Sequence, residues 1–124
     1  MLLDTDVMVD ILRGHPPALA WAVGSGLTPL DLPGLVAMEL LQGCRNLAEQ
    51  RLLERKLLGF TLHWPTQTDC QRAFQDFAAY RLSQGLGLID ALIGQTAVGI
   101  GETLATFNVK HYAVITGLTI VQPY

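Results

Sequence analysis

The architecture can be read from Leu2-Leu3-Asp4-Thr5-Asp6-Val7, where a short apolar strand runs directly into a helix. Thr5 or Asp6 can cap this helix, because a short polar side chain accepts a hydrogen bond from the free amides of a first turn. Asp4 stands where the strand ends. Ligands of open α/β sheets bind at the carboxyl ends of the strands, so we predict that Asp4 binds a ligand and that Asp6 is the cap.

Short apolar strands and helices alternate along the rest of the chain. Helices are expected over about 5–14, 16–24, 34–43, 46–58, 66–84 and 88–100, and strands over 30–32, 60–64, 103–106 and 119–121. This alternation predicts an α/β fold in which helices pack around a mainly parallel sheet. A chain of 124 residues fits a single domain of this kind, spanning 1–124.

The composition limits what the surface can do. Half of the residues are hydrophobic and 15% are charged, against about 25% charged in an average soluble domain. So few charges cannot cover the surface, and we expect an apolar patch for dimerisation or for a partner. The net charge of −3 argues against extensive nucleic-acid binding, because neutralising phosphates requires Lys and Arg.

Targeting segments and common metal motifs are not evident. The first residues lack the basic and apolar regions of a signal peptide, and the longest uncharged stretch, 14–30, is broken by proline and glycine. We therefore expect a cytoplasmic protein without a membrane segment. Cys44 and Cys70 form no motif, and we expect both to be buried free thiols. His15, His63 and His111 lack the spacing of a transition-metal site.

Asp90 is the most informative acidic residue. Steps of three, four and seven residues along its helix reach an apolar face made of Leu86, Gly87, Ile93, Gly94 and Ala97. An ionised carboxylate there is costly unless a positive group meets it, and no Lys or Arg stands between Arg81 and Lys110. A bound cation would meet this need. An Arg from elsewhere in the fold would also meet it. Alternatively, the carboxylate could lie at the rim of the face and avoid the cost of burial.

Three other residues each have a functional and an ordinary interpretation. Asp4 can bind a metal or cap a helix, and Asn108 can be a ligand or a turn residue. Glu39 can bind a metal or be the one exposed Glu between two apolar stripes. Together, Asp4, Glu39 and Asp90 would supply the carboxylate oxygens that Mg²⁺ prefers. One or two such ions can activate a water for hydrolysis of a phosphodiester.

Four segments occur in the order and spread seen in PIN domains, and they most resemble the VapC toxins of bacterial and archaeal toxin–antitoxin pairs. They are Leu3-Asp4-Thr5-Asp6-Val7, Met38-Glu39-Leu40-Leu41-Gln42-Gly43, Leu88-Ile89-Asp90-Ala91-Leu92-Ile93 and Thr106-Phe107-Asn108-Val109-Lys110-His111-Tyr112. The ending, Gly117-Leu118-Thr119-Ile120-Val121-Gln122-Pro123, is also similar. The resemblance implies a three-layer α/β/α sandwich, a Mg²⁺- or Mn²⁺-dependent endoribonuclease that cleaves RNA, a homodimer, and neutralisation by an antitoxin protein.

The resemblance also implies roles for individual residues. Asp4, Glu39 and Asp90 match the acidic residues that hold the metal, and a fourth acidic region falls at Asn108, so these four form the expected catalytic set. Asp6, Thr106 and Lys110 are further candidates for the site. Arg13, Arg45 and Lys110 are candidates for contacts with RNA phosphates.

Two other functions remain open from the sequence. A receiver-type phospho-acceptor domain has about this length, an acidic pair after its first strand (Asp4 and Asp6) and a Lys after a late strand (Lys110). It also needs an Asp at the end of a middle strand, where this chain has Trp64-Pro65, and it leaves Asp90 unexplained. The second alternative is a catalytically inactive PIN fold that only binds RNA, against which the three carboxylates argue.

Overall fold

The computed structural model describes residues 1–26 and 31–124, and at its centre is a parallel sheet. Its strands are β1 (Leu2–Leu3), β2 (Asp31–Pro33), β3 (Thr61–His63), β4 (Leu104–Ala105) and β5 (Ile120–Val121), in the spatial order β3-β2-β1-β4-β5. β1 lies in the middle, with Leu2 opposite both Asp31 and Leu104. The sheet was expected to be mainly parallel, and every pair of described strands is parallel.

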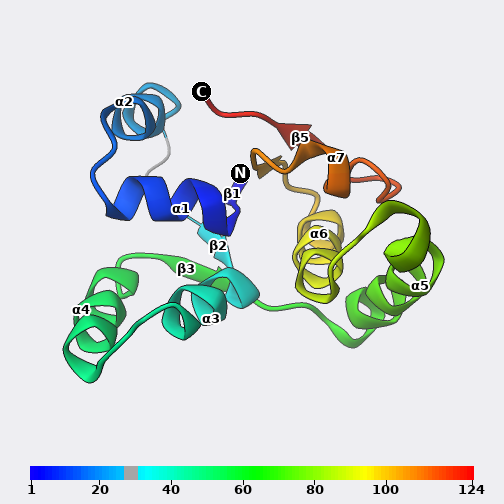
Figure 1. The fold of residues 1–124 in the computed structure, drawn as a ribbon. Coiled ribbons are helices and arrows are strands. Elements are labelled where there is room, and N and C mark those ends of the chain that lie inside the picture. Colours follow the sequence, from blue (N-terminus) through cyan, green and yellow to red (C-terminus); the bar gives the residue numbers. More distant parts are fainter. Residues whose placement is uncertain (27–30) are drawn as a thin grey trace.

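Helices connect the strands and flank the sheet (Figure 1). They are α1 (Thr5–Leu12), α2 (Pro16–Gly24), α3 (Gly34–Gln42), α4 (Leu47–Leu57), α5 (Gln67–Gln84), α6 (Leu88–Ile100) and α7 (Val109–Tyr112). In Figure 1, α1 to α4 lie together on the left of the view, and α5, α6 and α7 lie on the right. The predicted α/β class, with a parallel sheet between helices, is confirmed.

The strand order reverses between β1 and β4. From β1, the sheet continues through β2 to β3 on one side and through β4 to β5 on the other. Connections that leave the carboxyl ends of two such strands diverge and open a crevice, which is where α/β sheets bind ligands. Asp4 follows β1 and Thr106 follows β4, so both residues stand at this crevice.

The buried interior is apolar and includes the whole of β1 and β4. Leu2, Leu3, Leu104 and Ala105 have no exposed surface. The inner face of α6 is buried in the same way at Ile93, Gly94 and Ala97, with Leu86 just before the helix. This confirms the apolar face that the sequence predicts around Asp90.

Gly94 allows the end of α7 and the segment that follows it to lie close to α6. A methyl group at this position would overlap the Ile115 side chain and touch the ring of Tyr112. Tyr112 ends α7 and is fully buried. Because Gly94 comes one helical turn after Asp90, this close approach brings Tyr112 next to the first turn of α6.

Two predictions about individual side chains are wrong. Asp4 itself caps α1, since its Oδ1 accepts a hydrogen bond from the Thr5 amide at 2.8 Å, so neither Thr5 nor Asp6 is the cap. Cys70 is exposed, because the buried side of α5 at this point carries Asp69 and Ala73. Cys44 is only half-buried, with its thiol donating to the Leu40 carbonyl.

Element boundaries agree with prediction to within a few residues, with one helix added. The strands are shorter than expected at both ends of 60–64 and 103–106, and Leu30 of the expected strand 30–32 lies outside the described residues. No sequence pattern predicts α7, because a single turn is too short to show helical periodicity.

Several large apolar side chains remain on the surface, and the apolar patch expected from the composition stays a prediction. Val23, Leu58, Phe74 and Leu82 are 76% to 88% exposed, and they belong to different parts of the chain. No helix within 1–26 or 31–124 combines the length and the apolar character needed to cross a membrane.

Candidate active site

Asp4 is the centre of a hydrogen-bond network at the carboxyl end of β1. Its Oδ1 accepts from the Thr5 amide at 2.8 Å and from the Tyr112 hydroxyl at 3.2 Å. Its Oδ2 accepts from the Thr106 hydroxyl at 2.7 Å. A carboxylate has about four lone-pair sites, so these donors leave about one free. Asp4 can therefore cap α1 and still bind a ligand, and the two roles do not exclude each other.

The Tyr112 hydroxyl joins Asp4 to Asp90. It lies 3.2 Å from Asp4 Oδ1 and 3.4 Å from Asp90 Oδ1. Asp90 stands in the first turn of α6, so carboxylates from opposite halves of the chain lie within two hydrogen-bond lengths of each other. Two of the three predicted metal ligands are thus neighbours at the crevice.

Asp6 fastens the first turn of α1 to the segment after β4. Its Oδ1 accepts from the Val7 amide at 2.7 Å, and its Oδ2 accepts from the Phe107 amide at 3.0 Å. The Thr106 hydroxyl lies 3.5 Å from the same Oδ2. Asp6 therefore brings the ends of β1 and β4 together, which keeps Thr106 within reach of Asp4.

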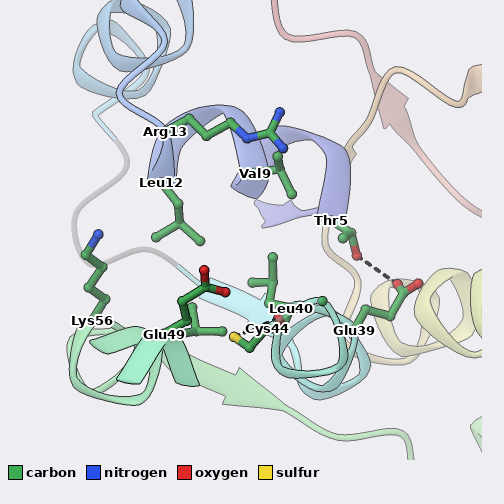
Figure 2. Close-up of a pocket in the computed structure, with 11 residues that line it drawn as sticks. Thr5, Val9, Leu12, Arg13, Glu39, Leu40, Cys44, Glu49 and Lys56 are labelled. Atoms are coloured by element: carbon green, nitrogen blue, oxygen red, sulfur yellow. Dashed lines mark hydrogen bonds between the residues drawn. The ribbon is translucent and has the colours of Figure 1, made fainter. Parts of the chain in front are cut away.

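Glu39 joins this network from α3. The Thr5 hydroxyl donates to Glu39 Oε1 at 2.7 Å (Figure 2). Burial, the charges of Asp4 and Asp90, and more weakly that of Glu39, raise the pKa of the Tyr112 hydroxyl. Tyr112 therefore stays protonated and remains a hydrogen-bond donor among the three carboxylates.

Asn108 and the basic candidates take less part in the network. The Asn108 amide donates to the Thr106 hydroxyl oxygen at 3.0 Å, and its side-chain nitrogen lies 3.1 Å from Nδ1 of His111. Lys110 is exposed on α7. Arg45 pairs with Glu49 at 2.8 Å on the surface. Neither Lys110 nor Arg45 forms an ion pair with a crevice carboxylate within the described part of the chain.

Burial raises the pKa of both central carboxyl groups. For Asp4 it raises the pKa from the ordinary 3.8 to about 6, with the charges of Asp6 and Asp90 adding to the rise and hydrogen bonds to Asp4 opposing it. Burial also raises the pKa of Asp90. The charge of His111 is the largest influence that lowers this pKa, and it only partly offsets the effect of burial. Ionised carboxylates are therefore unfavourable here without a cation, as desolvation and like charges both penalise them.

An oxygen-binding divalent cation fits these donors. Within residues 1–26 and 31–124, no Lys, Arg or His forms an ion pair with Asp4, Asp6, Glu39 or Asp90. In the same ranges, no three His, Cys, Asp or Glu side chains stand close enough together to surround an ion unaided. Mg²⁺ usually keeps several waters and takes only one or two protein carboxylates directly. Asp4 and Asp90 meet that requirement, and the participation of Glu39 stays a prediction.

A groove begins at Thr5 and Glu39 and runs between α1, α3 and α4 (Figure 2). Its apolar lining includes Val9, Leu12, Leu40 and Leu53, and its charged lining residues are Arg13, Glu39, Glu49 and Lys56. In Figure 2, the Thr5–Glu39 hydrogen bond lies at one end of this groove and Lys56 at the other.

Sequence reasoning missed the roles of Tyr112 and Thr5. A buried tyrosine needs a partner for its hydroxyl, so the placement of Tyr112 in an apolar segment near Asn108 was a usable signal. Thr5 gave no such signal, because its partner Glu39 is 34 residues away in the sequence and nothing local pairs the two.

Comparisons with known proteins agree with this geometry. The PIN domain family matches residues 1–115. The protein named Ribonuclease VapC10 of Mycobacterium tuberculosis is 35% identical over 120 residues, covering 95% of this chain and 90% of the relative. Ribonuclease VapC19 of the same species is 34% identical over 123 residues, covering 94% and 95%.

Solved structures give the same result for the fold. A chain of a toxin–antitoxin complex from Klebsiella pneumoniae superposes with a TM-score of 0.77 at 27% identity, covering 99% of this chain and 97% of the other. VapBC-1 from nontypeable Haemophilus influenzae, at 23% identity and 98% and 96% coverage, also gives 0.77. The receiver-type alternative is therefore wrong. These matches show that the chain belongs to the PIN-domain family and is similar to its VapC ribonucleases.

Proposed function

We propose that this protein is an endoribonuclease of the VapC kind, the toxin of a type II toxin–antitoxin pair, which hydrolyses RNA with a divalent metal ion. The similarity to ribonucleases VapC10 and VapC19 over nearly the whole chain supports the activity. The similarity to a chain of a toxin–antitoxin complex supports the toxin role. The single observation that carries the metal dependence is the Asp4–Tyr112–Asp90 arrangement at the sheet crevice.

Asp4 and Asp90 would hold the ion, Mg²⁺ or Mn²⁺, with Glu39 as the third ligand. When bound, such an ion activates a water and neutralises charge on the phosphate undergoing displacement. The chain's own residues prepare the ligands for this task. The Thr106 hydroxyl orients one oxygen of Asp4, and the Thr5 hydroxyl orients Glu39. Side chains that are already oriented lose little conformational freedom when the ion binds, and this prior orientation favours the reaction.

RNA would meet few positive charges on this surface, and those few would contact phosphates. Arg13 lines the groove that starts at Glu39. Lys110 is exposed on α7, two residues after Asn108. Two or three phosphate contacts suffice for a substrate held at a small site, although they give weak overall affinity and modest salt dependence. The net charge of −3 is compatible with this arrangement.

The antitoxin would bind in the groove between α1, α3 and α4. An amphipathic segment fits an apolar groove through its apolar face, and Val9, Leu12, Leu40 and Leu53 supply such a surface. Inhibition would be most direct if the segment placed an Arg among the carboxylates, since a guanidinium binds carboxylates through two hydrogen bonds. We further propose that the toxin is a homodimer and acts in the cytoplasm, where its RNA substrate is found.

The decisive experiment is cleavage of RNA by the purified protein with and without metal. Cleavage should require Mg²⁺ or Mn²⁺, stop on addition of chelator, and be lost in Asp90→Ala. The matched control is Asp10→Ala, which also removes an aspartate but one bonded to the Tyr124 hydroxyl instead of Tyr112. Full activity in Asp90→Ala would refute the mechanism. RNA binding without cleavage by the parent protein would support the inactive, RNA-binding alternative.

A further inference from the structure

The Tyr112 hydroxyl lies between the carboxylates of Asp4 and Asp90, which would otherwise face each other directly. It lies 3.2 Å from Asp4 Oδ1 and 3.4 Å from Asp90 Oδ1. Both distances exceed the roughly 2.5–2.7 Å of a strong hydrogen bond from a hydroxyl to a carboxylate. A hydroxyl has a single proton, so Tyr112 shares it between the two oxygens and forms a strong hydrogen bond to neither.

The rest of the fold holds this hydroxyl in place. Tyr112 has no exposed surface, and its ring packs beside Gly94, where a methyl group would overlap Ile115 and touch the ring. The ring therefore cannot swing away from the crevice without opening the α6–α7 contact. Within the described residues, Asp90 accepts side-chain hydrogen bonds from Tyr112 alone.

Asp4 and Asp90 differ in how firmly they are held. Asp4 is fixed by Thr5 and Thr106 in addition to Tyr112. Asp90 has neither of these supports and depends on Tyr112 to point its Oδ1 toward Asp4. Two unscreened carboxylates repel each other, and a side chain with one weak support would rotate away from its neighbour.

We propose that Tyr112 is a positioning residue that holds Asp90 beside Asp4 before the metal arrives, and so raises the affinity of the site for a divalent ion. This inference rests on the proposed metal-dependent function. A hydrogen bond to a ligating carboxylate orients it and reduces the rearrangement needed on binding, and loss of such bonds commonly weakens metal affinity about 10- to 100-fold.

The test is titration of chelator-treated protein with Mn²⁺, by calorimetry or by the Mn²⁺ spin-resonance signal. In Tyr112→Phe, which keeps the buried ring, the dissociation constant for Mn²⁺ should rise about tenfold or more. RNA cleavage by this variant should recover at high Mn²⁺, so that the Mn²⁺ concentration for half-maximal rate increases while the rate at saturation changes little. The matched control is Tyr124→Phe, which removes a hydroxyl bonded to Asp10 at 2.7 Å and should leave Mn²⁺ affinity unchanged.

Each outcome separates this inference from the proposed function. If the parent neither binds Mn²⁺ nor cleaves RNA, the proposed function fails and the inference fails with it. If the parent binds and cleaves while Tyr112→Phe binds Mn²⁺ equally well, only the positioning role is refuted. Tighter binding by Tyr112→Phe would also refute it, since the hydroxyl would then be a competitor of the ion. Melting and circular dichroism of the variant show whether it folds, and Tyr112→Met provides a second variant that lacks the hydroxyl.

Discussion

Replacement of Asp4 by Asn should stabilise the metal-free protein at neutral pH. The folded pKa of Asp4 is about 6 and its ordinary value is 3.8, and a difference of one in pKa corresponds to about 1.36 kcal/mol. The ionised Asp4 therefore costs the folded state about 3 kcal/mol when no cation is present. Asn keeps the shape and the acceptor at Oδ1, while the hydroxyl of Thr106 can reverse to accept from the new amide.

The direction of the pH dependence follows from proton binding. Between about pH 4 and pH 6 the folded protein holds a proton on Asp4 that the unfolded chain has released. The free energy of unfolding therefore falls as pH rises through this window and levels off above it. Asn carries no such proton, so the stability advantage of Asp4→Asn over the parent should grow by about 2 kcal/mol between pH 4 and pH 7, since a small part of the cost is already present at pH 4.

The measurement is urea unfolding in chelator at both pH values, followed by tryptophan fluorescence. Asp10→Asn is the control, because Asp10 lies on the same helix and also accepts a hydroxyl, that of Tyr124. Since burial is the largest cause of the Asp4 shift, most of the effect should persist when Asp90 is also changed to Asn. A stability difference that stays constant, or shrinks, between pH 4 and pH 7 would refute the reasoning.

Three further predictions use simpler assays. Asp90→Asn should stabilise the metal-free protein to a smaller extent than Asp4→Asn while abolishing cleavage, as thermal melts and RNA digests would show. Saturating Mg²⁺ or Mn²⁺ should raise the melting temperature of the parent by several degrees and that of Asp90→Asn much less, because the ion binds only the folded site; equal shifts in both proteins would contradict the assignment. Gly34→Ala should cost about 1–3 kcal/mol in urea unfolding, because its methyl group would overlap the ring of Trp64, whereas Gly24→Ala, which meets nothing, should be close to neutral.

Much of the candidate site could be predicted because it depends on local patterns. Asp4 follows a two-residue apolar strand, and the carboxyl ends of parallel strands share one edge, so its position follows from the sequence. Asp90 could be singled out because helical periodicity shows the apolar face around it, which the burial of Ile93 and Ala97 confirms. Both predictions needed only residues close in sequence and the general geometry of strands and helices.

The contacts that were missed connect distant parts of the chain. Tyr112 reaches Asp4 across 108 residues, and Asp6 reaches the Phe107 amide across 101. No periodicity encodes such pairings, which depend on how α1 and α7 lie against neighbouring strands. The error at the cap of α1 has another origin. The sequence prediction assigns capping and ligand binding to different residues, although the two oxygens of Asp4 have enough lone pairs for both.

The energetic cost at Asp4 links the proposed metal to the proposed antitoxin. A folded-state penalty of about 3 kcal/mol for the ionised carboxyl is relieved by any cation that reaches it, whether a divalent ion or the guanidinium of a partner. Both would bind the same carboxylates, so their binding should be mutually exclusive, and each should stabilise the fold through the same linkage. Excess Mn²⁺ should therefore weaken an antitoxin segment that carries the Arg, and should leave unaffected one in which that Arg is replaced by an uncharged residue. A segment whose affinity does not respond to Mn²⁺ would show that inhibition does not involve the carboxylates and acts through the apolar groove alone.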